Sequence, residues 1–394
     1  MNLVSELDLP VFDYTAPGFA ADMYHDQLAA IRRQHWLARS PFAYIVLDLA
    51  AGEFFLRSAA TAFPGRQLAE YFGVTDGPLA TYIDNSIQNL TGEQHHRLRS
   101  LVEHAFTSRA ADRWRPVMRG FIERLWARVG AYGACDFVPA IAHPYPSLTI
   151  ATVLGAPHQD AGRLHEWSSW VQRQFDVRAL ERNLIDIERA VKEVEEYVRA
   201  LLSARRRDPR DDLISELVRS DLGAEECVSL VVNLLAGGID TTAGQLAHAI
   251  RLFAAHPAQW ALLAERPVLA AAAVEEVLRF EPVTPFTARI CLTDVEHRGV
   301  CFPAGTIIAI CAERANRETA DGERFDIVAS RETRPLTFGA GPHYCLGVNL
   351  ARAELEEALA FLAPRAPGLA LAAQPRLGGV EGIYGIGKLP ITWS

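Results

Sequence analysis

Near the C-terminal end, residues 338–347 read FGAGPHYCLG, with glycines and a proline around a single cysteine. A helical pattern, VNLARAELEEALAFL, begins directly after them, so Cys345 lies at the N-terminus of a predicted helix. Backbone N–H groups and the helix dipole favour an anion there, and we expect the Cys345 thiol to shift toward thiolate, the form that binds metals. Glycines at 339, 341 and 347 permit close approach by a bulky planar group.

Other uses of this cysteine fit the segment less well. A glycine-rich turn around an inert, buried cysteine explains neither Phe338 nor the glycines. Activation of the thiol by His343 is disfavoured because residues two apart in an extended segment point to opposite faces. A zinc site needs further Cys or His ligands, and the sequence has no clustered pair. A thiolate that serves as axial ligand of haem iron needs only one cysteine.

The pattern F-G-x-G-x-H-x-C-x-G resembles the cysteine-ligand loop of the cytochrome P450 family, the haem-thiolate monooxygenases. The resemblance implies that Cys345 is the proximal iron ligand, that Phe338 packs beside its sulfur and that His343 reaches a haem propionate. Gly339 and Gly347 belong to the same haem-binding loop, and the helix from about Leu346 would run beneath the porphyrin.

A second segment, Val228–Gly244, reads VSLVVNLLAGGIDTTAG, an apolar helical pattern with adjacent glycines followed by an acid and two threonines. Glycine costs a helix interior about 1 kcal/mol, so a ligand lying against the backbone would explain the pair. The alternative is that Gly237 ends one helix and Asp240 caps another. In the resembled family, G-G-x-D-T-T is the distal helix above the iron. This implies that Gly237 borders the haem and that Asp240 and Thr241 supply protons for O–O cleavage.

A third motif pairs Glu276 with Arg279 on one face of a predicted helix, AAVEEVLRF. Alone, such a pair is an ordinary surface ion pair of little energetic value. The spacing E-x-x-R, with GERF following at Gly322–Phe325, resembles the Glu–Arg–Arg network of the family. Glu276, Arg279 and Arg324 would then lock the irregular segment that supports the cysteine loop. Gly322 stands where the family usually has proline.

Three cations complete the resemblance. His95 and Arg99 lie one turn apart in GEQHHRLRSLVEHAF, and Arg289 lies in TARICL. Singly, each is an ordinary solvated cation. Two propionates, however, need about two to four charge-assisted donors. The order of these residues in the chain is similar to that in the family and assigns His95, Arg99 and Arg289 to the propionates.

Composition excludes several classes of function. With 394 residues, 49% hydrophobic and 22% charged, the chain is typical of globular proteins. A net charge of -9 argues against a nucleic-acid partner. The cysteines form no CxxC pair, which fits neither a disulfide framework nor a zinc ribbon. We expect no membrane-spanning segment, since the longest apolar run, Val228–Ile239, stops at Asp240. The N-terminus lacks the pattern of a secretory signal, so we expect a cytoplasmic protein.

Periodicity predicts a mainly α chain with small antiparallel β-sheets, an α+β fold. Helical spacing dominates residues 92–280 and returns over 346–363, while short apolar runs predict β-rich portions at 41–60, 283–334 and 367–394. Residues 61–90 read as a long apolar-lined loop over a site. The arginines that end the amphipathic helix 184–206 are expected in solvent. The resemblance implies one triangular haem-thiolate domain over 1–394, with haem between the long distal helix and the helix after Cys345.

The implied activity is that of a monooxygenase with haem b and O2, which inserts one oxygen atom into a hydrophobic or aromatic molecule, as in hydroxylation during specialised metabolism. Alternatives are an oxidase or peroxygenase of the same fold that performs coupling or epoxidation, and a haem-binding or recruitment module without catalysis. By family analogy the following residues are expected to border the substrate: Tyr82, Ile83, Leu235, Val283, Phe286, Ile383 and Tyr384.

The expected partners follow from the same resemblance. Electrons would come from a ferredoxin-type donor that docks on the proximal side, where positive charge attracts an acidic protein. The substrate is expected to be a small molecule, either free or attached to a carrier protein. The basic residues expected at the docking face are Arg97, Arg109, Arg113 and Arg352.

Overall fold

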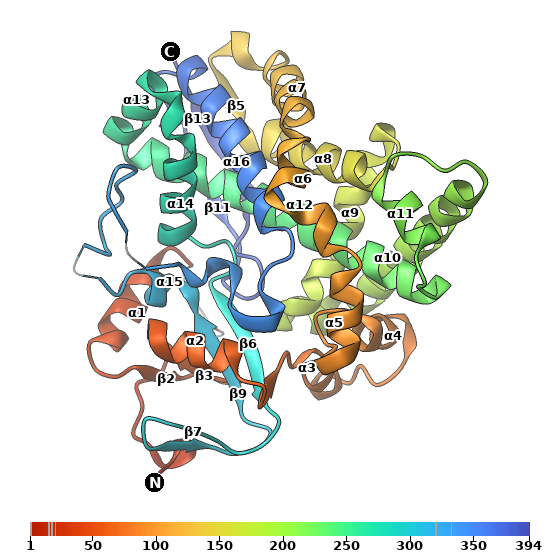
Figure 1. The fold of residues 1–394 in the computed structure, drawn as a ribbon. Coiled ribbons are helices and arrows are strands. Elements are labelled where there is room, and N and C mark those ends of the chain that lie inside the picture. The colour runs from red at the N-terminus through yellow and green to blue at the C-terminus, as the bar shows by residue number, and fades with distance from the viewer. Residues whose placement is uncertain (1, 15, 17–18, 20, 320, 332) are drawn as a thin grey trace.

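The computed structural model describes residues 2–14, 16, 19, 21–319, 321–331 and 333–394, most of them in helices. Figure 1 shows a helical array beside a smaller β-region that includes the N-terminal strands. The longer helices are α1 (Tyr24–Arg32), α2 (Leu49–Arg57), α3 (Gly65–Tyr71), α4 (Gly77–Asn85), α5 (Gly92–Ser100), α6 (Ser108–Asp112), α7 (Arg115–Trp126), α8 (Pro144–Leu154), α9 (Ala161–Gln172), α10 (Val177–Arg207), α11 (Leu213–Arg219), α12 (Ala224–Ala255), α13 (Pro257–Glu265), α14 (Ala270–Phe280), α15 (Ala312–Asn316) and α16 (Val348–Leu362).

The strands form small sheets. They are β1 (Asn2–Leu3), β2 (Leu37–Arg39), β3 (Tyr44–Val46), β4 (Thr61–Ala62), β5 (Ala134–Asp136), β6 (Phe286–Cys291), β7 (Val295–His297), β8 (Val300–Phe302), β9 (Ile307–Cys311), β10 (Ala370–Leu371), β11 (Arg376–Leu377), β12 (Ile386–Lys388) and β13 (Pro390–Thr392). The largest sheet has the order β2-β3-β9-β6-β4. Its β3–β9 pair is parallel, with Tyr44 opposite Ile308, so the sheet is mixed rather than antiparallel as predicted.

Helix α12 runs through the core. The N–H of Gly223 donates to the Glu226 carboxylate over 2.9 Å at its first turn, and the Pro257 ring begins the next helix. Within the described residues, α12 alone has the length and composition to cross a membrane. The expectation that no segment is long enough was therefore wrong. Yet 67% of its most apolar window is buried, which is typical of a core helix.

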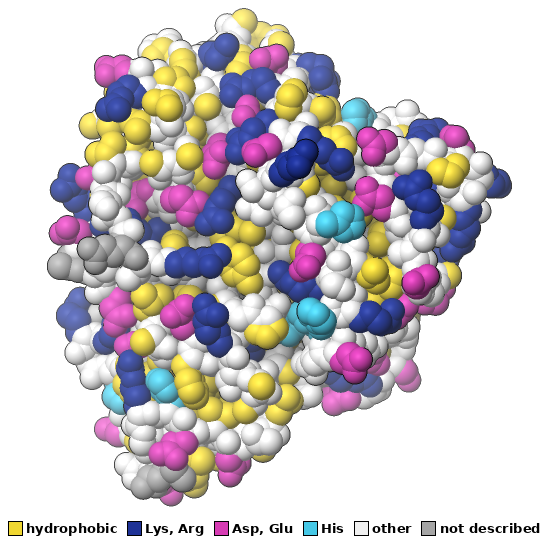
Figure 2. Space-filling model, viewed as in Figure 1, with side chains coloured by type: hydrophobic (Ala, Val, Ile, Leu, Met, Phe, Trp, Pro, Cys, Tyr) yellow, Lys and Arg dark blue, Asp and Glu magenta, His cyan; other side chains and the backbone are white. Residues whose placement is uncertain are grey.

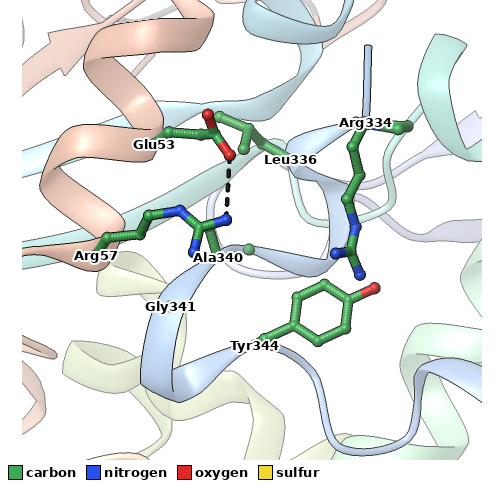
Figure 3. Close-up of a pocket in the computed structure, with 9 residues that line it drawn as sticks. Glu53, Arg57, Arg334, Leu336, Ala340, Gly341 and Tyr344 are labelled. Carbon is green, nitrogen blue, oxygen red and sulfur yellow. Dashed lines mark hydrogen bonds and ion pairs between the residues drawn. The ribbon is translucent and has the colours of Figure 1, made fainter. Parts of the chain in front are cut away.

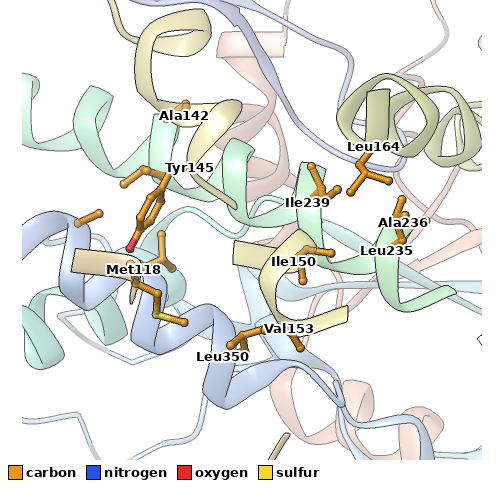
Figure 4. Close-up of a cluster of buried hydrophobic side chains, with 14 of the residues drawn as sticks. Met118, Ala142, Tyr145, Ile150, Val153, Leu164, Leu235, Ala236, Ile239 and Leu350 are labelled. Carbon is orange, nitrogen blue, oxygen red and sulfur yellow. The ribbon is translucent and has the colours of Figure 1, made fainter. Parts of the chain in front are cut away.

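The main hydrophobic core joins α7, α8, α12 and α16. Figure 4 shows Met118, Tyr145, Ile150, Ile239 and Leu350 among the buried side chains of this cluster. The hydroxyl of Tyr145 donates to the backbone carbonyl of Glu354 over 3.1 Å, which satisfies a buried polar group. This packing holds the distal helix α12 and the helix α16 in one rigid core on either side of the site described below.

Three expectations about local structure were wrong. Residues 61–90 hold helices α3 and α4 instead of a long loop. The segment 41–60 contains helix α2 as well as strand β3, because Asp48 caps a helix there and accepts from the Ala51 N–H over 2.9 Å. Of the arginines that end α10, Arg206 and Arg207 are exposed as expected, but Arg205 is buried and donates to Asp212 over 2.5 Å.

Candidate functional site

A cavity of about 480 Å³ separates α12 from the loop that carries Cys345. The predicted haem-side residues that border it are His95, Arg99, Gly237, Thr241, Arg289, Phe338, Gly339, His343, Cys345 and Gly347. These residues come from a short helix, the distal helix, a strand and the cysteine loop. The fold therefore brings together groups from opposite ends of the chain around one apolar space.

The cysteine loop is held in shape by its own backbone. The N–H of Cys345 donates to the Phe338 carbonyl over 3.0 Å. Gly339 and Gly341 have φ of +70° and +73°, a region that favours glycine. A Cβ on Gly341 would also lie 2.8 Å from the carbonyl oxygen of Leu56. The loop thus packs backbone to backbone on α2, which fixes the position at which Cys345 borders the cavity.

The thiol itself differs from expectation. Burial raises the pKa of Cys345, and the opposing effects of the Gly347 N–H and of Arg99 and Arg352 do not overcome it. The prediction of a thiol already shifted toward thiolate was wrong, because Cys345 precedes α16 by several residues and desolvation outweighs the helix end. A metal ion would supply the positive charge that a thiolate needs here.

Glycines leave open space on both sides of the cavity, on α12 and on the cysteine loop. A Cβ built on Gly237, Gly339 or Gly347 would meet no described atom within 4 Å. By contrast, a Cβ on Gly238 would lie 2.4 Å from Cδ1 of Ile150. Both glycines border the cavity, but only Gly238 also allows α12 to pack closely on Ile150 of α8. This space fits a planar macrocycle.

The predicted cations gather at one end of the cavity. The rings of His95 and His343 lie 4.2 Å apart between centroids, and Arg99 donates to the Tyr344 carbonyl over 2.7 Å. Arg289 is 4% exposed, and within the described residues it donates to the neighbouring carbonyl of Ala288 over 2.9 Å. Burial lowers the pKa of Arg289 to about 10.

The pKa of His343 also indicates that positive charge is concentrated at this end of the cavity. Its pKa is lowered to about 3, first by burial and then by the charges of His95, Arg289 and Arg99. A neutral His343 therefore lies near the guanidinium groups of Arg99 and Arg289, and no carboxylate is among the charges that shift its pKa within the described residues. Two propionates would neutralise the group, so the donors fit an iron porphyrin with Cys345 as its ligand.

The distal pair is divided between two faces of α12. Thr241 borders the cavity, and its hydroxyl donates to the Gly237 carbonyl over 2.6 Å. Asp240 points toward α9, where its Oδ2 accepts from the Ser168 hydroxyl over 2.6 Å. The hydroxyl is therefore placed for chemistry in the cavity, while the acid is turned toward the outside of the site.

Of the seven residues predicted to border the substrate, Val283, Phe286 and Ile383 line the cavity. The other four lie in the hydrophobic core. They are Tyr82, Ile83, Leu235 and Tyr384. Their assignment to the substrate pocket was wrong. The position of a residue in a helix or turn indicates which region it lies in, but not whether its side chain points to the cavity or to the core.

Two acidic residues of the cavity were missed. Glu354 on α16 lines it, its Oε1 is buried without a hydrogen-bond partner in the described chain, and burial raises its pKa to about 8. Glu381 also lines it, and burial raises its pKa. Nothing in the local pattern marks Glu354, because ARAELEEAL reads as an amphipathic helix with solvated acids.

The Glu276 network is real but has a different third member. Arg279 holds Glu276 by two hydrogen bonds of 2.7 and 2.8 Å, and Arg331 adds two of 2.9 and 3.3 Å. Arg324 contributes only its backbone carbonyl, since its side chain is exposed and pairs with Asp326. The prediction that the Arg324 side chain completes the network was wrong.

A second, smaller cavity of about 220 Å³ opens on the other side of the cysteine loop. Figure 3 shows Arg57 of α2 paired with Glu53, and the Arg334 guanidinium above the ring of Tyr344. Figure 2 shows basic side chains spread among acidic ones over this face of the molecule. Two guanidinium groups, those of Arg57 and Arg334, thus lie behind the loop that presents Cys345, one of them paired with Glu53.

Comparison with known proteins agrees with this geometry. The cytochrome P450 family model matches residues 73–362. Luteothin monooxygenase of Streptomyces thioluteus is 36% identical over 395 residues, which cover 98% of this chain and 97% of that protein. The crystal structure of CalO2 superposes with a TM-score of 0.90 at 30% identity and covers 98% of this chain and 99% of that one. P450BioI, in complex with an acyl-ligated acyl carrier protein, has a TM-score of 0.88 at 27% identity and covers 94% and 98% of the two chains.

Proposed function

Since the chain belongs to the cytochrome P450 family and is a monooxygenase, we propose that it hydroxylates a hydrophobic or aromatic small molecule of specialised metabolism. The observation that carries this proposal is the cavity in which Cys345 and Thr241 face a common apolar space. Both the thiol that would bind iron and the hydroxyl that would manage protons open onto the same volume.

We propose haem b as the cofactor. Cys345 would hold its iron, and His95, Arg99, Arg289 and His343 would hold its propionates. When bound, haem supplies the activation of O2, with one oxygen atom entering the substrate and the other leaving as water. The protein's own part is to exclude bulk water with apolar walls, to orient the substrate and to hold a proton at the Thr241 hydroxyl.

The substrate is inferred from the remaining lining of the cavity. Aromatic side chains from several elements, Phe42, Phe63, Phe175 and Phe286 among them, border it together with a few amides. Such walls favour an apolar or aromatic ligand oriented by a small number of hydrogen bonds. P450BioI was solved with a carrier-bound acyl chain, so a free substrate and its carrier-bound form are both to be tested as ligands.

For the electron donor we propose a ferredoxin-type protein that docks on the face behind Cys345. Arg109 and Arg113 are exposed there, whereas Arg97 pairs with Glu226 and Arg352 pairs with Glu275. Exposed arginines attract an acidic partner and raise its association rate. We also propose that residues 1–394 act as one catalytic domain in the cytoplasm.

The test of the cofactor assignment compares two cysteines. We expect Cys345→Ser to abolish the red-shifted Soret band of the reduced carbonyl complex, because a hydroxyl does not replace a thiolate ligand. Cys135→Ser is the matched control, since Cys135 is also half-buried but lies on β5, away from the cavity. An unchanged band in Cys345→Ser would contradict the proposal.

The test of the partner is kinetic. We expect the double reversal Arg109→Glu and Arg113→Glu to slow reduction by a plant-type ferredoxin about tenfold at low salt and less at high salt, measured by stopped flow under carbon monoxide. Arg207→Glu, an exposed arginine at the end of α10, is the control. Equal slowing by both changes would show that only net charge matters and would exclude this docking face.

A further inference from the structure

His25 on α1 lies between two buried carboxylates. Its Nε2 lies 3.0 Å from Oε1 and 3.1 Å from Oε2 of Glu281, which directly follows α14. Its Nδ1 lies 2.9 Å from Oε1 of Glu313 on α15, the helix beside α1 in Figure 1. The side chains of Glu281 and Glu313 are 2% and 0% exposed, whereas that of His25 is 20% exposed. One imidazole thus connects α1 to two other elements of the chain.

The geometry favours the imidazolium form of His25. The contact of Nδ1 with Glu313 lacks the alignment of a hydrogen bond, but a lone pair on Nδ1 would face a carboxylate oxygen at 2.9 Å and be repelled. Nε2 faces Glu281 at a similar distance, and only the imidazolium carries a proton on both ring nitrogens. Burial opposes this charge, yet the two carboxylates raise the pKa of His25 above its usual value. The connection between α1 and the carboxylates therefore depends on a proton.

Arginines hold both carboxylates in the ionised form. Arg251 of α12 donates to Oε2 of Glu281 over 2.6 Å. Arg314 donates twice to Glu313, over 2.7 and 2.9 Å, and Arg317 lies 3.1 Å from the same carboxylate. Burial opposes ionisation of both glutamates, but the histidine and these arginines hold their pKa values below the usual range. The negative charges that face the imidazole are therefore permanent near neutral pH.

Of the described groups around this cluster, His25 alone changes its charge near or above neutral pH. Burial lowers the pKa of His248 to about 4, so its ring is neutral. Glu323 stays charged, because Arg314 and Arg317 outweigh the effect of burial and lower its pKa. Burial raises the pKa values of the remaining groups, which are neutral at pH 7. They are Tyr24, Cys311 and Tyr384.

Tyr24 joins the charged cluster to a hydrophobic one. Its hydroxyl donates to Oε1 of Glu281 over 3.1 Å. Its ring packs edge-on against Tyr384, with 5.3 Å between centroids. Tyr24 and Tyr384 are fully buried in one cluster with Phe12, which lies in the segment before α1. The position of α1 is therefore coupled to the position of Phe12.

Phe12 and Tyr14 support a wall of the main cavity. The Phe12 ring lies 6.1 Å from the ring of Phe286, and the Tyr14 ring stacks on Phe286 at 6.2 Å with an interplanar angle of 28°. Both Tyr14 and Phe286 border the cavity. We call Phe12, Tyr14 and α1 the N-terminal wall. An apolar ligand in the cavity would contact this wall directly at Tyr14.

From these contacts we propose that protonated His25 is a positioning residue, which holds the N-terminal wall against the cavity and so sets the affinity for an apolar substrate. The inference rests on the proposed function, because it concerns how the substrate of that reaction is bound. Loss of the proton would leave two carboxylates facing an uncharged ring. The N-terminal wall would then separate from Phe286.

The direction of the pH dependence follows from the raised pKa of His25. Its contribution is fully present below the unfolded-state pKa of about 6.5 and is lost as pH rises through the folded-state value. Since the wall borders the cavity, proton binding and ligand binding favour each other. Substrate affinity should therefore fall in alkaline solution.

The experiment measures the Kd of clotrimazole, an apolar aromatic azole that is uncharged above pH 7, from the Soret shift of the holoenzyme. We expect wild-type affinity to fall about fivefold between pH 7 and pH 9. His25→Gln should bind about fivefold more weakly at pH 7 and lose little more by pH 9. The matched control is His104→Gln, because His104 faces one carboxylate, Glu216, over 3.0 Å but is 59% exposed. It should follow the wild-type profile.

His25→Lys separates the charge of the residue from its packing. A lysine ammonium stays protonated to about pH 10 and can donate to both carboxylates. We expect this variant to bind clotrimazole nearly as tightly as wild type at pH 7 and to keep that affinity at pH 9. Weak binding at both pH values would show that only the shape of the imidazole matters. If His25→Gln does not fold, this variant and the wild-type profile still decide the question.

Hydrogen exchange of the α1 amides gives a readout that needs no ligand. We expect these amides to exchange at least about threefold faster in His25→Gln than in wild type or His104→Gln at pH 7. Unchanged exchange in His25→Gln would refute the coupling of His25 to α1.

The outcomes separate this inference from the proposed function. A missing thiolate band in the carbonyl complex would overturn the monooxygenase assignment, while exchange of the α1 amides still reports on His25. If the band is present and His25→Gln binds clotrimazole like wild type at every pH, the positioning role is refuted. A pH dependence that persists in His25→Lys would refute it as well.

Discussion

Arg331 donates from Nη2 to Oε1 of Glu276 over 2.9 Å, although the two residues are 55 positions apart in the chain. Together with Arg279 and the Asp326 N–H it satisfies a carboxylate that is only 4% exposed. The contact ties the irregular segment before the cysteine loop to α14. It replaces the Arg324 side chain that the motif pattern had suggested.

The first prediction concerns this network. We expect Arg331→Ala to lower the free energy of unfolding by about 1–3 kcal/mol and Arg324→Ala to change it by less than about 0.5 kcal/mol, as measured by urea denaturation. Burial opposes ionisation of Glu276, but its hydrogen bonds with Arg279, Arg331 and the Asp326 N–H hold its pKa below the usual value.

The pH dependence of the same network has a definite sign. Because the folded-state pKa of Glu276 is lowered, its contribution to stability is present above the unfolded-state pKa and is lost as pH falls through the folded-state value. The difference in stability between wild type and Arg331→Ala should therefore shrink in acid. A difference that grows on acidification would contradict this account.

The second prediction contrasts two adjacent glycines. Gly237→Ala should stabilise the haem-free protein by about 0.5–1 kcal/mol, because its Cβ enters open space and alanine suits a helix better. Gly238→Ala should destabilise it by about 1–3 kcal/mol, because its Cβ would meet Ile150. Thermal unfolding compares the stabilities of the two variants. Haem titration should also show weaker haem binding for Gly237→Ala, because its methyl group would point into the cavity.

The third prediction concerns Arg289, a buried cation that we propose pairs with a haem propionate. Arg289→Met should weaken haem retention and, in the haem-free protein, raise the free energy of unfolding by up to roughly 3 kcal/mol, since the lowered pKa reflects the cost of burying the charge. Haem transfer to apomyoglobin measures retention. Arg207→Met on the surface should change neither haem retention nor stability. Equal losses of stability in the haem-bound and haem-free forms of Arg289→Met would argue for a purely structural role of Arg289.

The fourth prediction concerns Glu354, whose pKa burial raises to about 8. A carboxyl with a raised folded-state pKa costs nothing below its unfolded-state pKa and costs progressively more as pH rises toward the folded-state value. We expect Glu354→Gln to match wild type in stability near pH 4.5 and to exceed it by roughly 4 kcal/mol above pH 8. Urea denaturation at several pH values across that range measures the difference in stability between Glu354→Gln and wild type. A difference that disappears at high pH would disprove the raised pKa of Glu354.

Much of the haem side of the site could be predicted from sequence. Phe338, Gly339, Cys345 and Gly347 lie within one short segment, where neighbours in sequence are neighbours in space. The spacing of His95 and Arg99 likewise puts both on one helical face. The expected thiolate was wrong, however, because the pKa of Cys345 depends on burial by distant elements, which local sequence does not show.

The substrate side depends on packing between elements. Leu235 and Tyr384 directly follow residues that line the cavity, but their own side chains are buried in the core. The position of Asp240 was visible in the chain, but its outward direction and its contact with His165 were not.

The sequence by itself determined the mainly helical fold, the cysteine loop and the distal glycine turn, because each depends on contiguous residues and local backbone preferences. Only the tertiary structure decided which cation completes the Glu276 network, which side chains line the cavity and which histidine lies beside the Asp240 carboxylate. These depend on side chains that meet across long separations, and their meeting is set by how whole helices pack against one another.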